Sequence, residues 1–204
     1  MSYYVVNDFE HETVIKRSRF LTVLKKLETE QDALDALAEL KSRYRDCSHL
    51  CYAYRVGERA ERTRFSDAGE PSGTAGMPIL QALIEAEATF SLAAVVRWFG
   101  GVKLGAGGLT RAYHSCAADA IALGGRRRYE LCDVLEVGCD LSLYGLVVRV
   151  AESRGAVVTA RDFADKVTLT LAVKDAATSV IKAITDACCG NASVKECGSH
   201  YLEI

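Results

Sequence analysis

Apolar positions recur along this 204-residue chain with two different periods, which predicts a protein that mixes strands and helices. Residues 12–24 alternate between apolar and polar positions, and residues 49–57 are rich in aromatic and branched side chains, so both are predicted strands. Residues 29–44 carry an apolar stripe at helical spacing, and Thr29 with Asp32 resembles the capping box that begins a helix. The expected buried stripe consists of Ala33, Leu34, Leu37, Leu40 and Tyr44.

Two glycine-rich segments interrupt this pattern in the middle of the chain. Residues 65–78, "FSDAGEPSGTAGMP", are rich in turn-forming side chains and predict a loop. Pro78 fits the first position of a helix that runs to about residue 88. Residues 91–99 predict a strand, and the second glycine-rich segment separates this strand from a helix over residues 107–123. The apolar face of that helix is expected to consist of Leu109, Ala112, Cys116, Ala120 and Leu123.

A second domain is predicted after the charged, turn-like segment "GGRRRYE", residues 124–130. We expect one domain over residues 1–128, also mixed α/β, and another over residues 131–204. The second domain follows a strand–helix–strand–strand–helix–strand order, which is the ferredoxin-like βαββαβ unit. Its predicted strands are residues 131–139, 156–162, 167–173 and 192–203, and its predicted helices are residues 142–154 and 175–189.

The composition is that of an ordinary globular protein, with half of the residues hydrophobic and a quarter charged. No apolar run approaches the length that crosses a membrane, and the N-terminal residues do not follow the pattern of a signal peptide. We therefore expect a cytoplasmic protein without a membrane partner. The eight cysteines form no C-x-x-C pair, which predicts free thiols, with Cys51, Cys116 and Cys132 as small core residues.

Positive charge is concentrated in one part of the chain although the net charge is −2. Between Ser91 and Arg128, six basic residues face a single acidic one, Asp119. A localised patch of this kind is the electrostatic footprint of anion binding. The basic residues are Arg97, Lys103, Arg111, Arg126, Arg127 and Arg128.

The second glycine-rich segment is the main candidate for an anion-binding site. Glycine allows close backbone approach, and the N-terminus of the following helix offers unpaired N–H groups. Its spacing matches neither the phosphate loop of nucleoside triphosphatases nor the dinucleotide fingerprint, and a tight strand-to-helix turn remains an open interpretation. The candidate residues are Arg97, Gly100, Gly101, Lys103, Gly105, Gly107, Gly108, Arg111 and His114.

The first glycine-rich segment lies, like the second, at the end of a predicted element, and the two loops could face one cleft. Its acids and hydroxyls that would line this cleft are Ser66, Asp67, Glu70, Ser72 and Thr74. The competing interpretation is a polar loop that satisfies its own backbone. His49 and Cys51 lie two apart on a predicted strand and therefore share a face, as a metal or nucleophile pair or as structural residues. Zinc needs three or four ligands, so we assign no metal. No base lies near the hydroxyls in sequence, and Ser72 is not in a G-x-S-x-G elbow, so we assign no catalytic residue and no cofactor.

Four stretches of the chain resemble the IMPACT family, and its bacterial YigZ-type branch in particular. They are "IKRSRF", "HLCYAYRVG", "FSDAGEPSGTAGMPIL" and "VVRWFGGVKLGAGGLTRAY", in the expected order within residues 1–125. One departure is Ala68, where the family usually places a second aspartate. The resemblance implies an α+β protein with an N-terminal domain like the second domain of ribosomal protein S5. It implies a ferredoxin-like C-terminal domain similar to the last domain of elongation factor G.

The resemblance also directs the functional expectation. Eukaryotic relatives regulate translation by binding the activator of a kinase that acts on an initiation factor. We expect a non-enzymatic, translation-linked binding protein that contacts RNA or the ribosome through the basic glycine-rich loop. Two alternatives stay open: a protein-interaction module, and an enzyme acting on a phosphorylated or nucleotide substrate, since small-molecule kinases of the galactokinase group share the S5-type fold.

Overall fold

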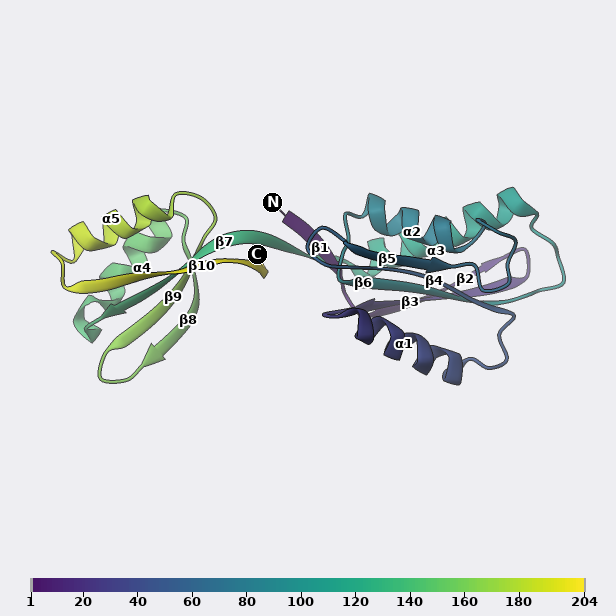
Figure 1. The fold of residues 1–204 in the computed structure, drawn as a ribbon, viewed down its shortest axis with the longest axis horizontal. Helices are drawn as coiled ribbons and strands as arrows, with labels where there is room; N and C mark the ends of the chain where they lie inside the picture. Colours follow the sequence, from purple (N-terminus) through teal and green to yellow (C-terminus); the bar gives the residue numbers. More distant parts are fainter. Residues whose placement is uncertain (1, 204) are drawn as a thin grey trace. The chain divides into compact units, whose positions relative to one another are not determined.

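The computed structural model describes residues 2–203 and divides into two compact units (Figure 1). The first is Tyr3–Arg128, and the second comprises the chain from Tyr129 onward together with Ser2. Strand β7 (Arg126–Cys139) contains the boundary. The other elements of the first unit are β1 (Ser2–Val6), β2 (Phe9–Ile15), β3 (Ser18–Lys26), α1 (Glu30–Arg43), β4 (His49–Val56), β5 (Arg62–Ser66), α2 (Gly76–Glu85), β6 (Ser91–Trp98) and α3 (Ala106–Gly124).

The first unit is built on a five-stranded sheet in the order β2-β3-β6-β4-β5, with every neighbouring pair antiparallel. Helix α1 covers one face, and α2 with α3 covers the other (Figure 1). Because side chains alternate along a strand, β6 supplies both cores: Val95 packs toward α2 and α3, and Val96 packs toward α1. The expected capping box is present, with Thr29 and Asp32 bonding each other's backbone at the start of α1.

Residues 12–24 form a hairpin and not the single strand that their alternation predicts. Strands β2 and β3 pair directly, with Ile15 opposite Ser18. Lys16 and Arg17 make the two-residue turn at φ of 45° and 67°. Such turns usually carry asparagine or glycine, so the sequence gives no local sign of the reversal.

Three further expectations in the first unit were wrong in detail. Leu34 and Leu123 are 48% and 61% exposed, because each lies at the margin of its helix's apolar face. Helix α2 begins at Gly76, so Pro78 is its third residue and not its first. Helix α3 ends at Gly124, and after Gly125 the chain continues directly as strand β7 where a turn-like joint was expected.

The second unit has the expected ferredoxin-like order, and the α+β class is confirmed. The sheet order is β1-β7-β9-β8, and β10 also pairs with β7. The β10–β7, β7–β9 and β8–β9 pairs are antiparallel. Its core lies between this sheet and the two helices α4 and α5. The elements after β7 are a 3₁₀ turn (Leu141–Leu143), α4 (Tyr144–Ser153), β8 (Val157–Phe163), β9 (Val167–Val173), α5 (Ala177–Ala187) and β10 (Ala192–Glu203).

All eight cysteines are free thiols. Cys51, Cys116 and Cys132 are buried, which confirms their expected place in the cores. Within residues 2–203, no helix is both long enough and apolar enough to cross a bilayer.

We expect a fragment of residues 1–128 to fold independently, because the first unit contains both faces of its own sheet and its own apolar cores. Urea unfolding of the fragment, followed by circular dichroism, should give a single cooperative transition. A fragment without a cooperative transition, beside a well-folded full chain, would place the domain boundary elsewhere.

Candidate functional site

A buried ion pair connects the first glycine-rich segment to strand β6, which leads into the second glycine-rich segment. The guanidinium of Arg97, on β6, lies 2.5 Å from Glu70 Oε1, and the Tyr113 hydroxyl on α3 donates to the same oxygen at 2.7 Å. The side chains of Arg97 and Glu70 are only 5% and 4% exposed. The expected roles of Arg97 in anion contact and of Glu70 in lining a cleft are therefore not supported, because each charge is compensated inside the protein.

The remaining contacts of Arg97 are with one hydroxyl and two aromatic rings. Its Nη2 donates to Ser18 Oγ at 3.3 Å, and its guanidinium lies 5.4 Å and 5.5 Å from the ring centroids of Phe20 and Phe99. Its Nε has no hydrogen-bond partner within the described part of the chain. The Arg97 guanidinium is thus held by the Glu70 carboxylate, by the Ser18 hydroxyl and by two nearby rings.

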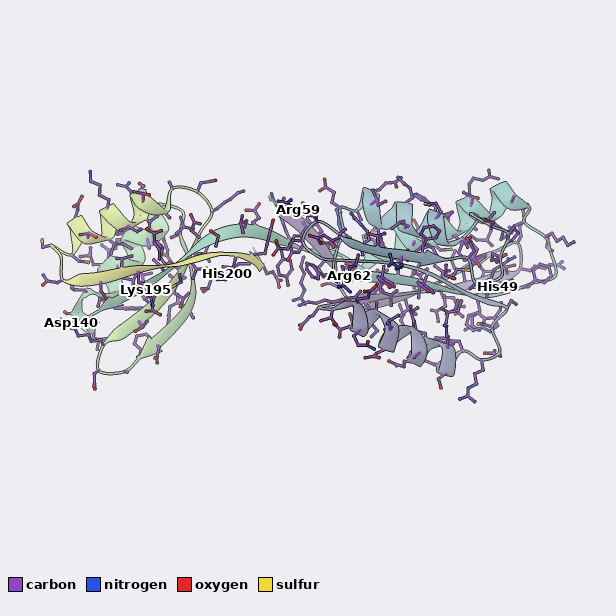
Figure 2. All side chains as sticks on the ribbon, in the orientation of Figure 1. His49, Arg59, Arg62, Asp140, Lys195 and His200 are labelled. Atoms are coloured by element: carbon purple, nitrogen blue, oxygen red, sulfur yellow. The ribbon has the colours of Figure 1, made fainter. Side chains whose placement is uncertain are left out.

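His49 and Cys51 share one face of β4, as expected, and both contact the first glycine-rich segment (Figure 2 labels His49). Cys51 Sγ donates to the carbonyl of Asp67 at 3.0 Å, and His49 Nδ1 lies 3.0 Å from the carbonyl of Ala68. Burial raises the pKa of Cys51 to about 12, so this thiol is protonated at neutral pH and is no nucleophile. No group of three or more metal-ligating side chains occurs among the described residues.

Asp67 caps the N-terminus of α2 with its own carboxylate. The two carboxylate oxygens accept backbone N–H groups of Gly73, Ala75 and Gly76 at 2.8, 2.9 and 2.8 Å. Partial burial raises the pKa of Asp67, but the three N–H donors outweigh it and hold the pKa below its ordinary value. This geometry is that of a loop that satisfies its own backbone, and the Asp67 carboxylate occupies the position at this helix terminus where an external anion would bind.

The hydroxyls of the first glycine-rich segment do not form a catalytic group. Ser66 Oγ accepts the backbone N–H of Ala68 at 3.2 Å, and Thr74 Oγ1 donates to the carbonyl of Pro71 at 2.6 Å. Ser72 is exposed. These contacts are local turn contacts, and they agree with the structural role of Asp67 in the same loop.

The N-terminus of α3 is different, because no side chain caps it. Its N-cap is Gly105 at φ 72°, and its first turn contains no acidic residue. Lys103 and Arg111 are exposed, and neither makes an ion pair with any of residues 2–203. A Cβ placed on Gly107 would lie 3.6 Å from Arg111 Nη1, so the guanidinium runs alongside the first turn. This end of the helix combines unpaired N–H groups with two available cations.

The glycines of the second segment have separate roles. A Cβ on Gly100 would lie 1.9 Å from the carbonyl oxygen of Arg17, so the loop and the β2–β3 turn meet backbone to backbone. Gly101 and Gly105 adopt φ of 82° and 72°, where a side chain would be strained. Gly107 and Gly108 are helical residues of α3 and have no positive φ.

A groove of about 580 Å³ separates the N-terminal halves of α2 and α3. Arg111, His114 and Ser115 line it from α3, as their helical spacing predicts, and Met77 and Gln81 line it from α2. His114 Nε2 lies 2.9 Å from Glu85 Oε2, so this histidine already has a partner.

The basic residues expected to form one patch are divided between the two ends of α3. Arg126, Arg127 and Arg128 follow its C-terminus, and a helix of 19 residues is about 28 Å long. Arg126 donates to the carbonyl of Ala86 and lies 4.5 Å from the centroid of the Tyr4 ring. The positive charge at the glycine-rich segment is therefore that of Lys103 and Arg111.

The chain matches two domain models and several known proteins. Residues 16–121 match the model of the Impact N-terminal domain, and residues 137–191 match a domain of unknown function, DUF1949. The IMPACT family member YvyE of Bacillus subtilis is 32% identical over 99% of this chain and 94% of its own length. The IMPACT family member YigZ of Escherichia coli is 39% identical over 48% of this chain and 50% of its own length.

One solved structure, described as that of a hypothetical protein, has a similar fold. It superposes with a TM-score of 0.60 at 25% identity and covers 95% of this chain and 96% of its own. The likeness therefore extends through both units.

Replacing Glu70 by glutamine should lower the free energy of unfolding by about 3–5 kcal/mol, because it leaves the buried Arg97 without its counter-ion. Glu39→Gln, on an exposed position of α1, is the matched control and should change stability by less than about 0.5 kcal/mol. Urea unfolding measures both variants. Equal, small effects would show that the ion pair does not stabilise the fold.

The contribution of Asp67 should depend on pH. Because its folded pKa lies below the ordinary 3.8, its charge stabilises the fold above that value and ceases to do so as the pH falls through the folded pKa. The difference in unfolding free energy between the wild type and Asp67→Asn should be constant from pH 5 to 7 and shrink below about pH 3.8. A difference that persists unchanged at pH 3 would assign the effect to shape and not to charge.

Proposed function

Because the chain belongs to the IMPACT family, we propose that it is a non-enzymatic, translation-linked protein that binds RNA phosphate at the N-terminus of α3. The observation that carries the proposal is the contrast between two helix N-termini in one unit. Asp67 caps α2, whereas α3 lacks a side-chain cap and has Lys103 and Arg111 beside it. The second arrangement favours an external anion.

The accessible cations favour a polyanion over a small substrate. Lys103 and Arg111 are exposed on the surface and do not converge inside an enclosed cavity. The residues that would supply acid, base or nucleophile have structural contacts: Glu70 pairs with Arg97, and the Cys51 thiol is held protonated. Extended nucleic-acid backbones are bound largely through exposed lysine and arginine side chains.

The second unit gives less support for RNA contact through its sheet. Lys195 lies directly opposite Glu136 in the β10–β7 pair, so their charges offset each other (Figure 2 labels Lys195). Many RNA-binding sheets of this topology present aromatic side chains to stack with bases. The cross-strand neighbours of Glu136 are instead Lys195 and Thr170. We therefore assign the phosphate contact to the first unit.

The groove between α2 and α3 favours a second candidate, a protein-interaction module. Met77 is 45% exposed at its edge, and apolar grooves between helices commonly receive a segment of another protein. This candidate agrees with the family resemblance to translation regulators. It predicts that the chain binds a protein partner equally well in the presence and in the absence of RNA.

The Lys103→Glu/Arg111→Glu variant should bind single-stranded RNA at least tenfold more weakly, measured by fluorescence anisotropy of a labelled 20-nucleotide RNA of mixed sequence. The slope of log affinity against log salt should decrease by about 0.7 for each lost phosphate contact. The melting temperature should be nearly unchanged, since exposed charges contribute about 0–1 kcal/mol to folding.

The matched control is Arg149→Glu/Lys182→Glu, which makes the same change of net charge on exposed helix positions of the second unit. It should leave affinity and slope within twofold of the wild type. If both double variants weaken binding equally, the effect is one of net charge and the assigned site is wrong. Unchanged RNA affinity in the Lys103/Arg111 variant would favour the protein-interaction candidate.

A further inference from the structure

We propose that single-stranded RNA is the form bound, with one base stacked on Phe99. The inference rests on the proposed function and extends its site to an aromatic–basic patch, defined as Lys16, Arg17, Phe99, Val102 and Lys103. These residues come from the β2–β3 turn and the loop between β6 and α3. Exposed basic groups around an aromatic ring are the usual means of binding a single strand without sequence preference.

Phe99 is an exposed ring on a backbone that is fixed in place. Its side chain is 48% exposed, yet its N–H donates to Ser48 Oγ at 3.0 Å. The preceding residue, Trp98, donates its Nε1 to Asp46 Oδ2 at 2.9 Å, and the following N–H, of Gly100, donates to Ser18 Oγ at 3.3 Å. Three consecutive residues are thus anchored to other segments, which reduces the entropy cost of presenting the ring to a ligand.

The β2–β3 turn brings two more cations to the same loop. The carbonyl of Arg17 packs against Gly100, next to Phe99. Lys16 and Arg17 are exposed, and neither has an ion-pair partner in the part of the chain that the structure describes. Both hold positive φ, a conformation that costs energy for residues other than glycine. Two long basic side chains therefore occupy a turn that glycine would form more easily.

The other basic side chains near this patch already have partners inside the protein. Arg19 is paired with Glu12 and lies 4.0 Å from the centroid of the Trp98 ring. Arg97 is buried against Glu70. The charges available to a phosphate backbone next to Phe99 are those of Lys16, Arg17 and Lys103.

A single strand fits this patch better than a duplex. In duplex RNA the bases stack on each other and their faces are inaccessible, whereas unpaired bases are free to stack on an aromatic side chain. Stacking on Phe99 would serve any base, and the three cations would follow the backbone on either side. Duplex RNA would use the cations alone.

The test uses the full chain and one labelled 20-nucleotide RNA, either single-stranded or annealed to its complement. Phe99→Leu keeps an apolar side chain but removes the aromatic face. It should lower single-strand affinity by about five- to one-hundred-fold and leave duplex affinity and the salt slope within error. Phe99→Trp should restore single-strand affinity, and its fluorescence should be quenched by RNA. Phe163→Leu, at a 57% exposed ring of the second unit, is the matched control and should change neither affinity.

Lys16→Glu/Arg17→Glu should lower both affinities and reduce the salt slope by about 0.7 for each lost contact. If Phe99→Leu binds single strands as tightly as the wild type while Lys103→Glu/Arg111→Glu does not, the stacking inference is overturned and the proposed function stands. If the wild type binds neither RNA form, both are overturned. A Phe99→Leu defect that is equal for single and double strands would also overturn the stacking inference.

Discussion

The first unit depends on one buried ion pair, between Arg97 at the end of β6 and Glu70 in the loop before α2. Tyr113 donates to the same carboxylate, so one oxygen joins a central strand, a long loop and α3. A buried charge of either sign without a counter-ion lowers the free energy of unfolding, so each partner of the pair requires the other. This mutual requirement fixes the loop against the sheet and positions the N-terminus of α3 beside it.

The pair also divides the charged groups of this region into two classes. Glu70 pairs with Arg97, and Asp67 accepts backbone N–H groups at the start of α2. Both acidic side chains of the loop therefore stabilise the fold. Lys103 and Arg111 form no ion pair with the described residues. The positive surface is accordingly small and local, and it coexists with a net charge of −2 for the whole chain.

The sequence predicted most elements because their signals are local. The capping box of Thr29 and Asp32 and the order of the second unit depend on neighbours in the chain. The Arg97–Glu70 pair joins residues that are 27 positions apart, and the spacing of apolar residues along the chain does not predict it. One signal was present: Arg97 follows a run of apolar residues in a predicted strand, where a charge needs a buried partner. The Lys16–Arg17 reversal gave no comparable sign, because its residues are not those that usually turn.

Strand β6 is buried from Ser91 through Arg97 and serves a separate core on each face. A change of length in this strand would disturb more contacts than a substitution at one position. Inserting or deleting one residue would exchange the two faces beyond that point. Arg97 would then enter the leucine-rich layer under α1 and lose Glu70, while both cores lost their matching side chains. The length of this segment is therefore as strongly constrained by the two cores as its buried side chains are.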